Sequence, residues 1–403
     1  MPQSLSHREI ASAENGARGN RTNLKPRFIC SEAYRATSHG SRHPLAIPRV
    51  ALAMDICQAN GWLNNGNFID SPCATKSQLT RFHEPAYVAA VEAAEKTGKV
   101  PEDVKWRHHL GVNGNPLFDG MFWRSATACG GGMLAAQLLA KNMTRVIYSP
   151  GGGQHHAFAG RASGFCYFNE PVLTILNLLD LGAKRVFYLD LDAHHGDGVQ
   201  AAFANDERVM TVSIHEGGRW PMKRHYNDIK LVRGPGGVED RAGGWARNLP
   251  VPAGFNDMEL TYIMENAVLP LAHQFSCDAV YVQAGCDALA DDPQSKLSLS
   301  NRALWSAIDK MRLVAPKLIV TGGGGYNPYA VGRCWAGIWA VLNDFNIPAR
   351  LPIAAEACLR HVVWDHRLGR HVSVKWLTTL ADPPNNGPVR SEIKYLVRCV
   401  LEP

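Results

Sequence analysis

The stretch RVFYLDLDAHHGDG, residues 185–198, predicts both a fold class and the place of a functional site. Its first half, 185–191, is mostly apolar with β-branched and aromatic side chains, as is typical of a buried strand in a parallel sheet. Its second half holds two aspartates, two histidines and two glycines directly after that strand. Ligands bind at the carboxyl ends of the strands in open α/β sheets, so this order indicates an α/β fold with a site at that edge.

Other parts of the chain repeat this alternation of strand and polar segment. Further short apolar runs predict strands at 146–149, 209–214, 279–284 and 318–321, with helices between them at 171–181, 258–274 and 301–314. Such alternation implies right-handed crossovers and helices on both faces of one sheet. The sequence therefore predicts an α/β fold with a single open parallel sheet flanked by helices.

The length of 403 residues and the 46% share of hydrophobic residues suit one large domain. Residues 1–25 are polar with scattered arginines, which predicts a flexible leader. The catalytic domain is expected over 26–345. Residues 346–403 show little periodicity and are expected to form an extension that packs on or near the domain and contributes to homo-oligomer contacts.

Composition excludes several other classes of protein. The ten cysteines never form a CxxC pair, which argues against a zinc ribbon or a disulfide framework and favours reduced thiols in a cytoplasm. The net charge of +6 comes from dispersed basic residues, whereas a nucleic-acid binder should show a concentrated basic face. No apolar run approaches the roughly 20 residues needed to cross a bilayer, so no membrane span is expected.

A metal site is the best explanation of the residues after 185–191. Asp192 and His194 share one face because the side-chain period of a strand is two, and they offer donors that suit zinc, with ferrous iron as the alternative. Burying such carboxylates and an imidazole without a cation is costly. The predicted third ligand is Asp287, just after 279–284, and the thiolate of Cys286 is its competitor.

Groups for proton transfer and for carbonyl polarisation follow two other strands. His155 and His156 come after a glycine turn and supply a base and an acid, with Asp190 and Asp197 to orient the rings. Tyr326 follows four glycines after the strand 318–321, as suits a hydroxyl that stabilises an oxyanion. A phosphate-binding loop would instead end in GK[ST], which is absent here.

Five motifs in this order resemble the histone deacetylase family of the arginase–deacetylase superfamily. They are PGGGQHHA, GFCYFNE, LDLDAHHGDG, the segment around Asp287 and GGGGYN, and the resemblance covers residues 38–345. The segments CDALADDPQSKLSLSNRALW and GGGGYNPYAVGRCWAG are most similar to bacterial acetoin-utilisation (AcuC-type) deacetylases. The arginase branch fits less well, since its pair of manganese ions needs further bridging carboxylates.

The resemblance implies the arginase–deacetylase fold and a metal-dependent amidohydrolase that removes acetyl groups from acetyl-lysine in proteins. Small acetylated amines such as acetylpolyamines are the alternative substrates. It also implies a structural potassium ion near the zinc. The zinc ligands would be Asp192, His194 and Asp287. The catalytic residues would be His155, His156 and Tyr326, together with Asp190 and Asp197. The potassium ligands would be Asp190, Asp192, His194, Ser213 and Ile214.

The same resemblance assigns residues to the substrate channel. Gly164 and Phe165 would line it, Trp220 would form the opposite wall, and Gln294 would lie in the loop near its mouth. Arg49 is similar to the arginine of an internal channel for acetate exit. Gly114 stands where many relatives that act on peptides have an acidic residue that grips the substrate backbone.

Overall fold

The structure is a computed structural model and describes residues 24–36, 39–40, 43–222 and 234–402. Most of the predicted leader, residues 1–25, therefore lies outside the described residues. No helix among the described residues is long and apolar enough to cross a membrane.

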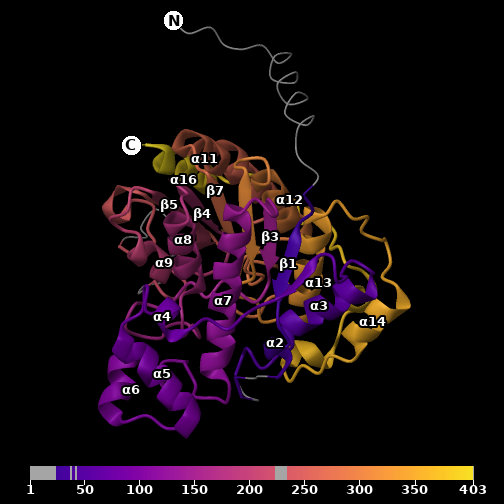
Figure 1. The fold of residues 1–403 in the computed structure, drawn as a ribbon. Helices are drawn as coiled ribbons and strands as arrows, with labels where there is room; N and C mark the ends of the chain where they lie inside the picture. Colours follow the sequence, from indigo (N-terminus) through magenta and orange to yellow (C-terminus); the bar gives the residue numbers. More distant parts are fainter. Residues whose placement is uncertain (1–23, 37–38, 41–42, 223–233, 403) are drawn as a thin grey trace, which may run out of the picture.

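One open sheet of eight parallel strands organises the molecule (Figure 1), as predicted. The strand order is β2-β1-β3-β8-β7-β4-β5-β6, and every neighbouring pair is parallel. The strands are β1 (Arg27–Cys30), β2 (Phe68–Asp70), β3 (Val146–Ser149), β4 (Val186–Asp190), β5 (Val209–Glu216), β6 (Ala246–Val251), β7 (Ala279–Gln283) and β8 (Lys317–Thr321).

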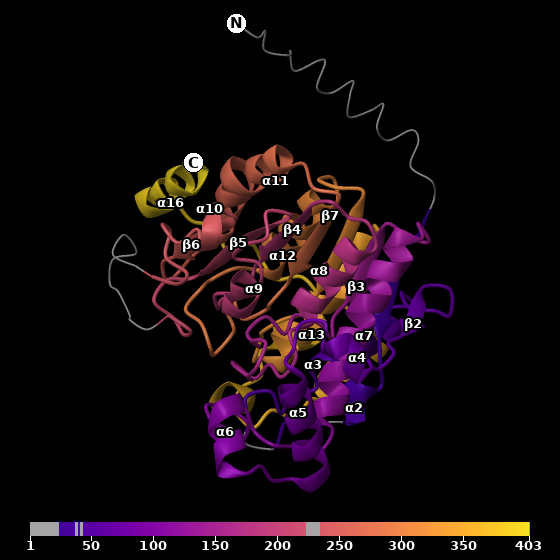
Figure 2. The same cartoon turned by 60° about the vertical axis from the view of Figure 1, so that its left-hand side comes forward.

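Helices cover both faces of this sheet, which explains why the central strands are apolar throughout (Figure 2). One face packs against α7 (Met121–Ala140), α8 (Glu170–Asp180) and α9 (Asp197–Ala202). The other face packs against α3 (Arg49–Ala59), α10 (Asp257–Ile263), α11 (Leu269–Phe275), α12 (Asn301–Met311) and α13 (Pro328–Leu342). The remaining helices of this part of the chain are α2 (Ala33–Ala36), α4 (Lys76–Leu79), α5 (Pro85–Thr97) and α6 (Glu102–His108).

The five predicted strands and three predicted helices are present with small shifts at their ends. The helix predicted at 258–274 differs most, because a π-helical turn, Met264–Val268, separates α10 from α11. The prediction omitted β1, β2 and β6. The first two are very short. Strand β6 contains an arginine, an asparagine and a proline, which interrupt the apolar pattern of a buried strand.

The residues after 345 pack against the domain through three helices. Helix α14 (Ile353–Arg360) contacts α3, α15 (Val374–Thr378) contacts α13, and α16 (Ser391–Leu401) contacts β6. The Arg247 side chain of β6 donates its Nε hydrogen to the carbonyl of Val400 in α16 over 3.0 Å. Helix α16 therefore lies along the outer edge of the sheet.

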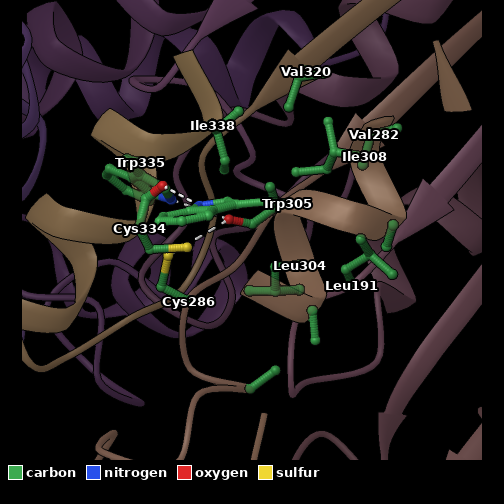
Figure 3. Close-up of a cluster of buried hydrophobic side chains, with 14 of the residues drawn as sticks. Leu191, Val282, Cys286, Leu304, Trp305, Ile308, Val320, Cys334, Trp335 and Ile338 are labelled. Atoms are coloured by element: carbon green, nitrogen blue, oxygen red, sulfur yellow. Dashed lines mark hydrogen bonds between the residues drawn. The ribbon is translucent and has the colours of Figure 1, made fainter. Parts of the chain in front are cut away.

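A cluster of buried hydrophobic side chains adjoins the carboxyl end of β7 (Figure 3). Trp335 of α13 donates its indole N–H to the carbonyl of Ala284, the residue after β7, over 3.0 Å. Trp305 of α12 donates to the carbonyl of Cys334 over 2.9 Å. Both indoles are buried with their hydrogen bonds satisfied, so this core fixes the strand end from which the site begins.

Candidate active site

Three predicted metal ligands meet where two adjacent strands end. Asp192 and His194 follow β4, Asp287 follows β7, and these strands are hydrogen-bonded neighbours in the sheet. The Nδ1 atom of His194 lies 3.2 Å from Asp192 Oδ1 and 2.9 Å from Asp287 Oδ2. The three ligand atoms lie within 4.8 Å of one another, and all three residues are buried.

The chemistry of this cluster fits a cation. Burial and the nearby Asp192 carboxylate raise the pKa of Asp287 to about 6, which reflects the cost of two buried carboxylates side by side. A bound cation would remove that cost, and one nitrogen with two carboxylate oxygens is a donor set that zinc and ferrous iron accept. A Cβ at Gly324 would lie 2.1 Å from Asp287 Oδ2, so the close approach of this loop requires glycine.

Cys286, the competing ligand, is not part of the cluster. Among the described residues, the group that could hold a metal consists of Asp192, His194 and Asp287 alone. The thiol of Cys286 is fully buried and faces Cys334 of α13 (Figure 3), and burial raises its pKa well above the usual value. It therefore behaves as a neutral core residue.

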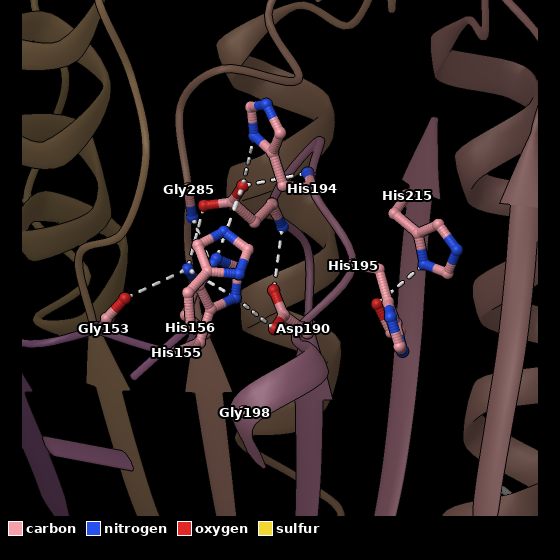
Figure 4. A network of polar contacts seen from close by, with 12 residues as sticks. Gly153, His155, His156, Asp190, His194, His195, Gly198, His215 and Gly285 are labelled. Atoms are coloured by element: carbon pink, nitrogen blue, oxygen red, sulfur yellow. Dashed lines mark hydrogen bonds and ion pairs between the residues drawn. The ribbon is translucent and has the colours of Figure 1, made fainter. Parts of the chain in front are cut away.

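Two histidine–aspartate pairs lie beside the candidate metal ligands, and Figure 4 shows His155, His156 and Asp190 next to His194. His155 Nδ1 is 2.7 Å from Asp190 Oδ2, and His156 Nδ1 is 2.7 Å from Asp197 Oδ1. The centres of the two imidazole rings are 3.9 Å apart. Tyr188 also donates to Asp190 over 2.6 Å, so the inner pair is fixed on both sides.

The two histidines have opposite electrostatic environments. Burial disfavours the charged form of His155, but the carboxylates of Asp190 and Asp192 outweigh it and raise its pKa to about 9. Burial and the charge of His155 lower the pKa of His156 to about 4. His156 is therefore neutral near pH 7. Its Nδ1 hydrogen is directed to Asp197, which leaves Nε2 to exchange a proton.

Tyr326 lies beside the three candidate metal ligands. Its ring centre is 6.5 Å from that of His194 and 6.3 Å from that of Phe165. Its backbone N–H donates to the buried carboxylate of Asp292 over 2.6 Å, which fixes the end of the glycine run.

The predicted channel walls lie next to the histidine pair. Gly164 has φ +53°, and a Cβ there would lie 2.4 Å from His156 Cδ2 and 2.5 Å from Trp220 Cη2, so only glycine fits between these rings. The rings of Trp220 and His156 are 4.7 Å apart. Phe165, with φ +67°, lines a cavity of about 60 Å³ together with His156 and Tyr326.

Comparison with known proteins agrees with this geometry. A model of the histone deacetylase domain matches residues 43–342. The chain belongs to the histone deacetylase family. It is 31% identical to the acetoin utilization protein AcuC of Bacillus subtilis over 81% of this chain and 84% of that protein. It is 30% identical to human histone deacetylase 1 over 78% of this chain and 64% of that protein, so the match spans less than two thirds of the human protein.

Solved structures confirm the histone deacetylase fold. A crystal structure of an HDAC homologue complexed with SAHA has a TM-score of 0.85 and 34% identity, covering 93% of this chain and 99% of that one. A crystal structure of an HDAC homologue from Aquifex aeolicus gives the same values. This member of the family is accordingly an enzyme, an amidohydrolase of the deacetylase type.

Other predicted residues of this deacetylase lie farther from the cluster. The side chain of Arg49 lines the cavity and donates to the carbonyl of Gly323 over 2.6 Å. Ser213 of β5 is paired with Asp190 of β4, and Ile214 follows it in β5. Gln294 donates its backbone N–H to Asp292 and is not among the residues that line the cavity.

Sequence reasoning missed one polar residue of the deacetylase site. Gln283, the last residue of β7, donates its amide Nε2 hydrogen to Asp192 Oδ2 over 2.9 Å and accepts the backbone N–H of Gly285 over 3.0 Å. It therefore holds a metal-ligand candidate in place from the neighbouring strand. The signal was a polar residue near the end of the apolar run 279–284.

Proposed function

We propose that this protein is a zinc-dependent deacetylase that hydrolyses the acetyl amide of acetyl-lysine in proteins. The observation that carries the proposal is the placement of His156 and Tyr326 around the three-residue cluster. Their ring centres lie 6.1 Å and 6.5 Å from that of His194. A base and an oxyanion donor therefore flank one metal site, as amide hydrolysis requires.

Asp192, His194 and Asp287 would hold the zinc, with ferrous iron as the alternative metal. A bound divalent metal would supply Lewis acidity, which polarises an amide carbonyl and makes water more acidic. The residues that we infer to hold a structural potassium ion nearby are Asp190, Asp192, His194, Ser213 and Ile214. The parallel pairing of Asp190 with Ser213 supports this second site, because it places these two residues side by side in adjacent strands.

The protein's own groups account for the proton transfers. Neutral His156 accepts a proton from the attacking water at Nε2, while Asp197 holds the Nδ1 hydrogen and stabilises the imidazolium that forms. The same Nε2 then donates this proton to the leaving lysine Nζ as the carbon–nitrogen bond breaks. His155 remains charged beside Asp190 and keeps a positive charge close to the developing oxyanion.

Tyr326→Phe is expected to reduce kcat by about 10²–10³-fold, because it removes one donor to the oxyanion. Folding and metal content should stay normal, since the backbone contact with Asp292 is retained. Steady-state kinetics with elemental analysis would measure both. The matched control is Tyr329→Phe, because the Tyr329 hydroxyl donates to Val362 and faces away from the site. Equal turnover in both variants would assign carbonyl polarisation to another group.

The nearby acidic side chains favour a lysine substrate over a polyamine. A distal ammonium needs a carboxylate at the channel mouth, but the carboxylates of residues 287–296 are already engaged. Asp291 accepts the indole N–H of Trp376 and forms an ion pair with Lys375. Asp292 is buried and accepts the backbone N–H of Gln294. Gln294 itself carries no charge.

Gly114 has no side chain that could bind a peptide backbone. It has φ +80°, and a Cβ there would lie 2.9 Å from Phe165 Cε1. A side chain at this position would therefore be strained and would displace a wall of the channel. The preference for a protein substrate is thus expected to be moderate.

The wild-type enzyme is expected to show a higher kcat/KM for an acetyl-lysine peptide than for N-acetylspermidine. Gln294→Glu should shift the ratio toward the polyamine by no more than about threefold, because residue 294 lies outside the cavity lining and its charge would attract the distal ammonium through screening solvent. Gln274→Glu is the matched control, because it adds the same negative charge at an exposed position in α11. A wild-type preference for the polyamine of about tenfold or more would overturn the proposed substrate class and leave the chemistry in place.

A further inference from the structure

A segment outside the family match contacts the loop that carries Asp287. The histone deacetylase domain match ends at residue 342, whereas α15 begins at Val374. Trp376 of α15 donates its indole N–H to Asp291 Oδ2 over 2.7 Å. The ammonium group of Lys375 lies 3.0 Å from the same oxygen. The C-terminal extension thus reaches the active-site loop four positions after Asp287.

Asp291 lies in a loop that is also bonded to the Tyr326 segment. Its carbonyl accepts the side-chain N–H of Asn327 over 2.9 Å. The next residue, Asp292, accepts the backbone N–H of Tyr326 over 2.6 Å. Any displacement of Asp291 would therefore move the backbone on which the Tyr326 hydroxyl depends.

Trp376 contacts the Tyr326 segment directly as well. Its ring stacks on that of Tyr329, with the centres 5.6 Å apart and the planes inclined by 16°. Tyr329 lies in the first turn of α13, three residues after Tyr326. Trp376 is 6% exposed, so one buried residue contacts both the loop of Asp291 and the first turn of α13.

The segment that carries Trp376 is itself fixed to the domain. Arg333 of α13 is fully buried and donates to the carbonyl of Thr379 over 2.6 Å and to Asp382 Oδ1 over 2.7 Å. The backbone N–H of Asp382 donates to Asn301 Oδ1 at the start of α12 over 2.9 Å. Trp376 thus projects from a firmly held backbone.

We propose that Trp376, assisted by Lys375 through Asp291, is a positioning residue for the Tyr326 hydroxyl. The inference rests on the proposed function, in which this hydroxyl polarises the acyl carbonyl. Four glycines precede Tyr326 and supply no side chains to pack against, so its position has to be set by contacts from outside the run. A displacement of about 1 Å at a reacting centre can reduce a rate by roughly 10²-fold.

The test compares two tryptophans that face the same tyrosine. Trp376→Phe keeps a ring over Tyr329 and removes the N–H that Asp291 accepts. Trp364→Phe is the matched control, because Trp364 also packs on Tyr329, at 6.3 Å, and is not bonded to Asp291. Hydrogen exchange at the Tyr326 amide, kcat, KM, metal content and Tm would be measured for both variants and the wild type.

Trp376→Phe is expected to accelerate exchange of the Tyr326 amide and to reduce kcat by about tenfold or more, with KM within about twofold of the wild type. Metal content and Tm should match those of Trp364→Phe, whose kcat stays near that of the wild type. Asp291→Asn should cost less than about threefold in kcat, because it keeps an acceptor for the indole and removes only a half-exposed ion pair.

Exchange that is equally fast in both tryptophan variants would overturn the proposal, and so would faster exchange in Trp376→Phe with unchanged kcat. If kcat fell as much in Trp364→Phe as in Trp376→Phe, Trp376 would contribute only to packing and the proposal would be wrong. The exchange measurement needs no substrate. If the wild-type enzyme were inactive on acetylated amines, the proposed function would be contradicted. The exchange rate of the Tyr326 amide would still show whether Trp376 positions the Tyr326 segment.

Discussion

His194→Ala is expected to abolish stoichiometric metal binding and to reduce deacetylation by about 10³-fold or more, since the chemistry that a metal supplies amounts to several kcal/mol. The imidazole is the single nitrogen donor of the cluster, and without it two carboxylates remain, too few to hold zinc firmly. Elemental analysis after dialysis and kinetics with an acetyl-lysine peptide would measure the two losses together.

The fold should survive this change. The His194 ring contacts the two neighbouring carboxylates, while the backbone N–H groups of Ala193, His194 and Gly324, which donate to Asp287 and Asp192, remain after the change to alanine. His273→Ala, an exposed histidine in α11, is the matched control and should keep full metal content. Full metal content in His194→Ala would show that His194 is not a metal ligand.

His156→Ala is expected to reduce kcat by about 10²–10⁴-fold, the usual contribution of one general acid–base group. The metal should stay bound, because His156 is not one of the three clustered ligands. Single-turnover kinetics at saturating acetyl-lysine peptide, with elemental analysis of the same sample, would separate loss of chemistry from loss of metal.

The neighbouring groups provide a graded series for this second prediction. Asp197→Asn keeps the shape of the partner of His156 but weakens its stabilisation of the imidazolium, so a smaller fall in kcat is expected. His155→Ala removes a charge rather than the proton carrier. If His155→Ala abolished turnover while His156→Ala kept it within about tenfold of the wild type, the two roles would have to be exchanged.

The sequence predicted the parallel sheet and the metal cluster because both depend on local order along the chain. The period of two placed Asp192 and His194 on one face, and the polar segment after the strand predicted at 279–284 offered Asp287. The choice of Asp287 over Cys286 was made from that same alternation, and the structure agrees, since Cys286 faces α13.

Other features depend on contacts between distant residues, which no local pattern reveals. Trp376 and Asp291 are 85 positions apart, and neither lies in a recognisable motif. Strand β2 has three residues, too few to show a period. The helix predicted at 258–274 is present, but its π-helical turn leaves the apolar pattern of the helix intact and could not be predicted from that pattern.

The position of α16 also bears on how this protein behaves among other copies of itself. Long uncovered edge strands are templates for pairing with a neighbouring chain. Here β2 is too short to serve, and β6 carries Pro250, which lacks an N–H, and has α16 along its outer side. Among the described residues, neither edge of the sheet therefore offers a long uncovered strand, and a variant shortened before Ser391 is expected to leave β6 more accessible to another chain.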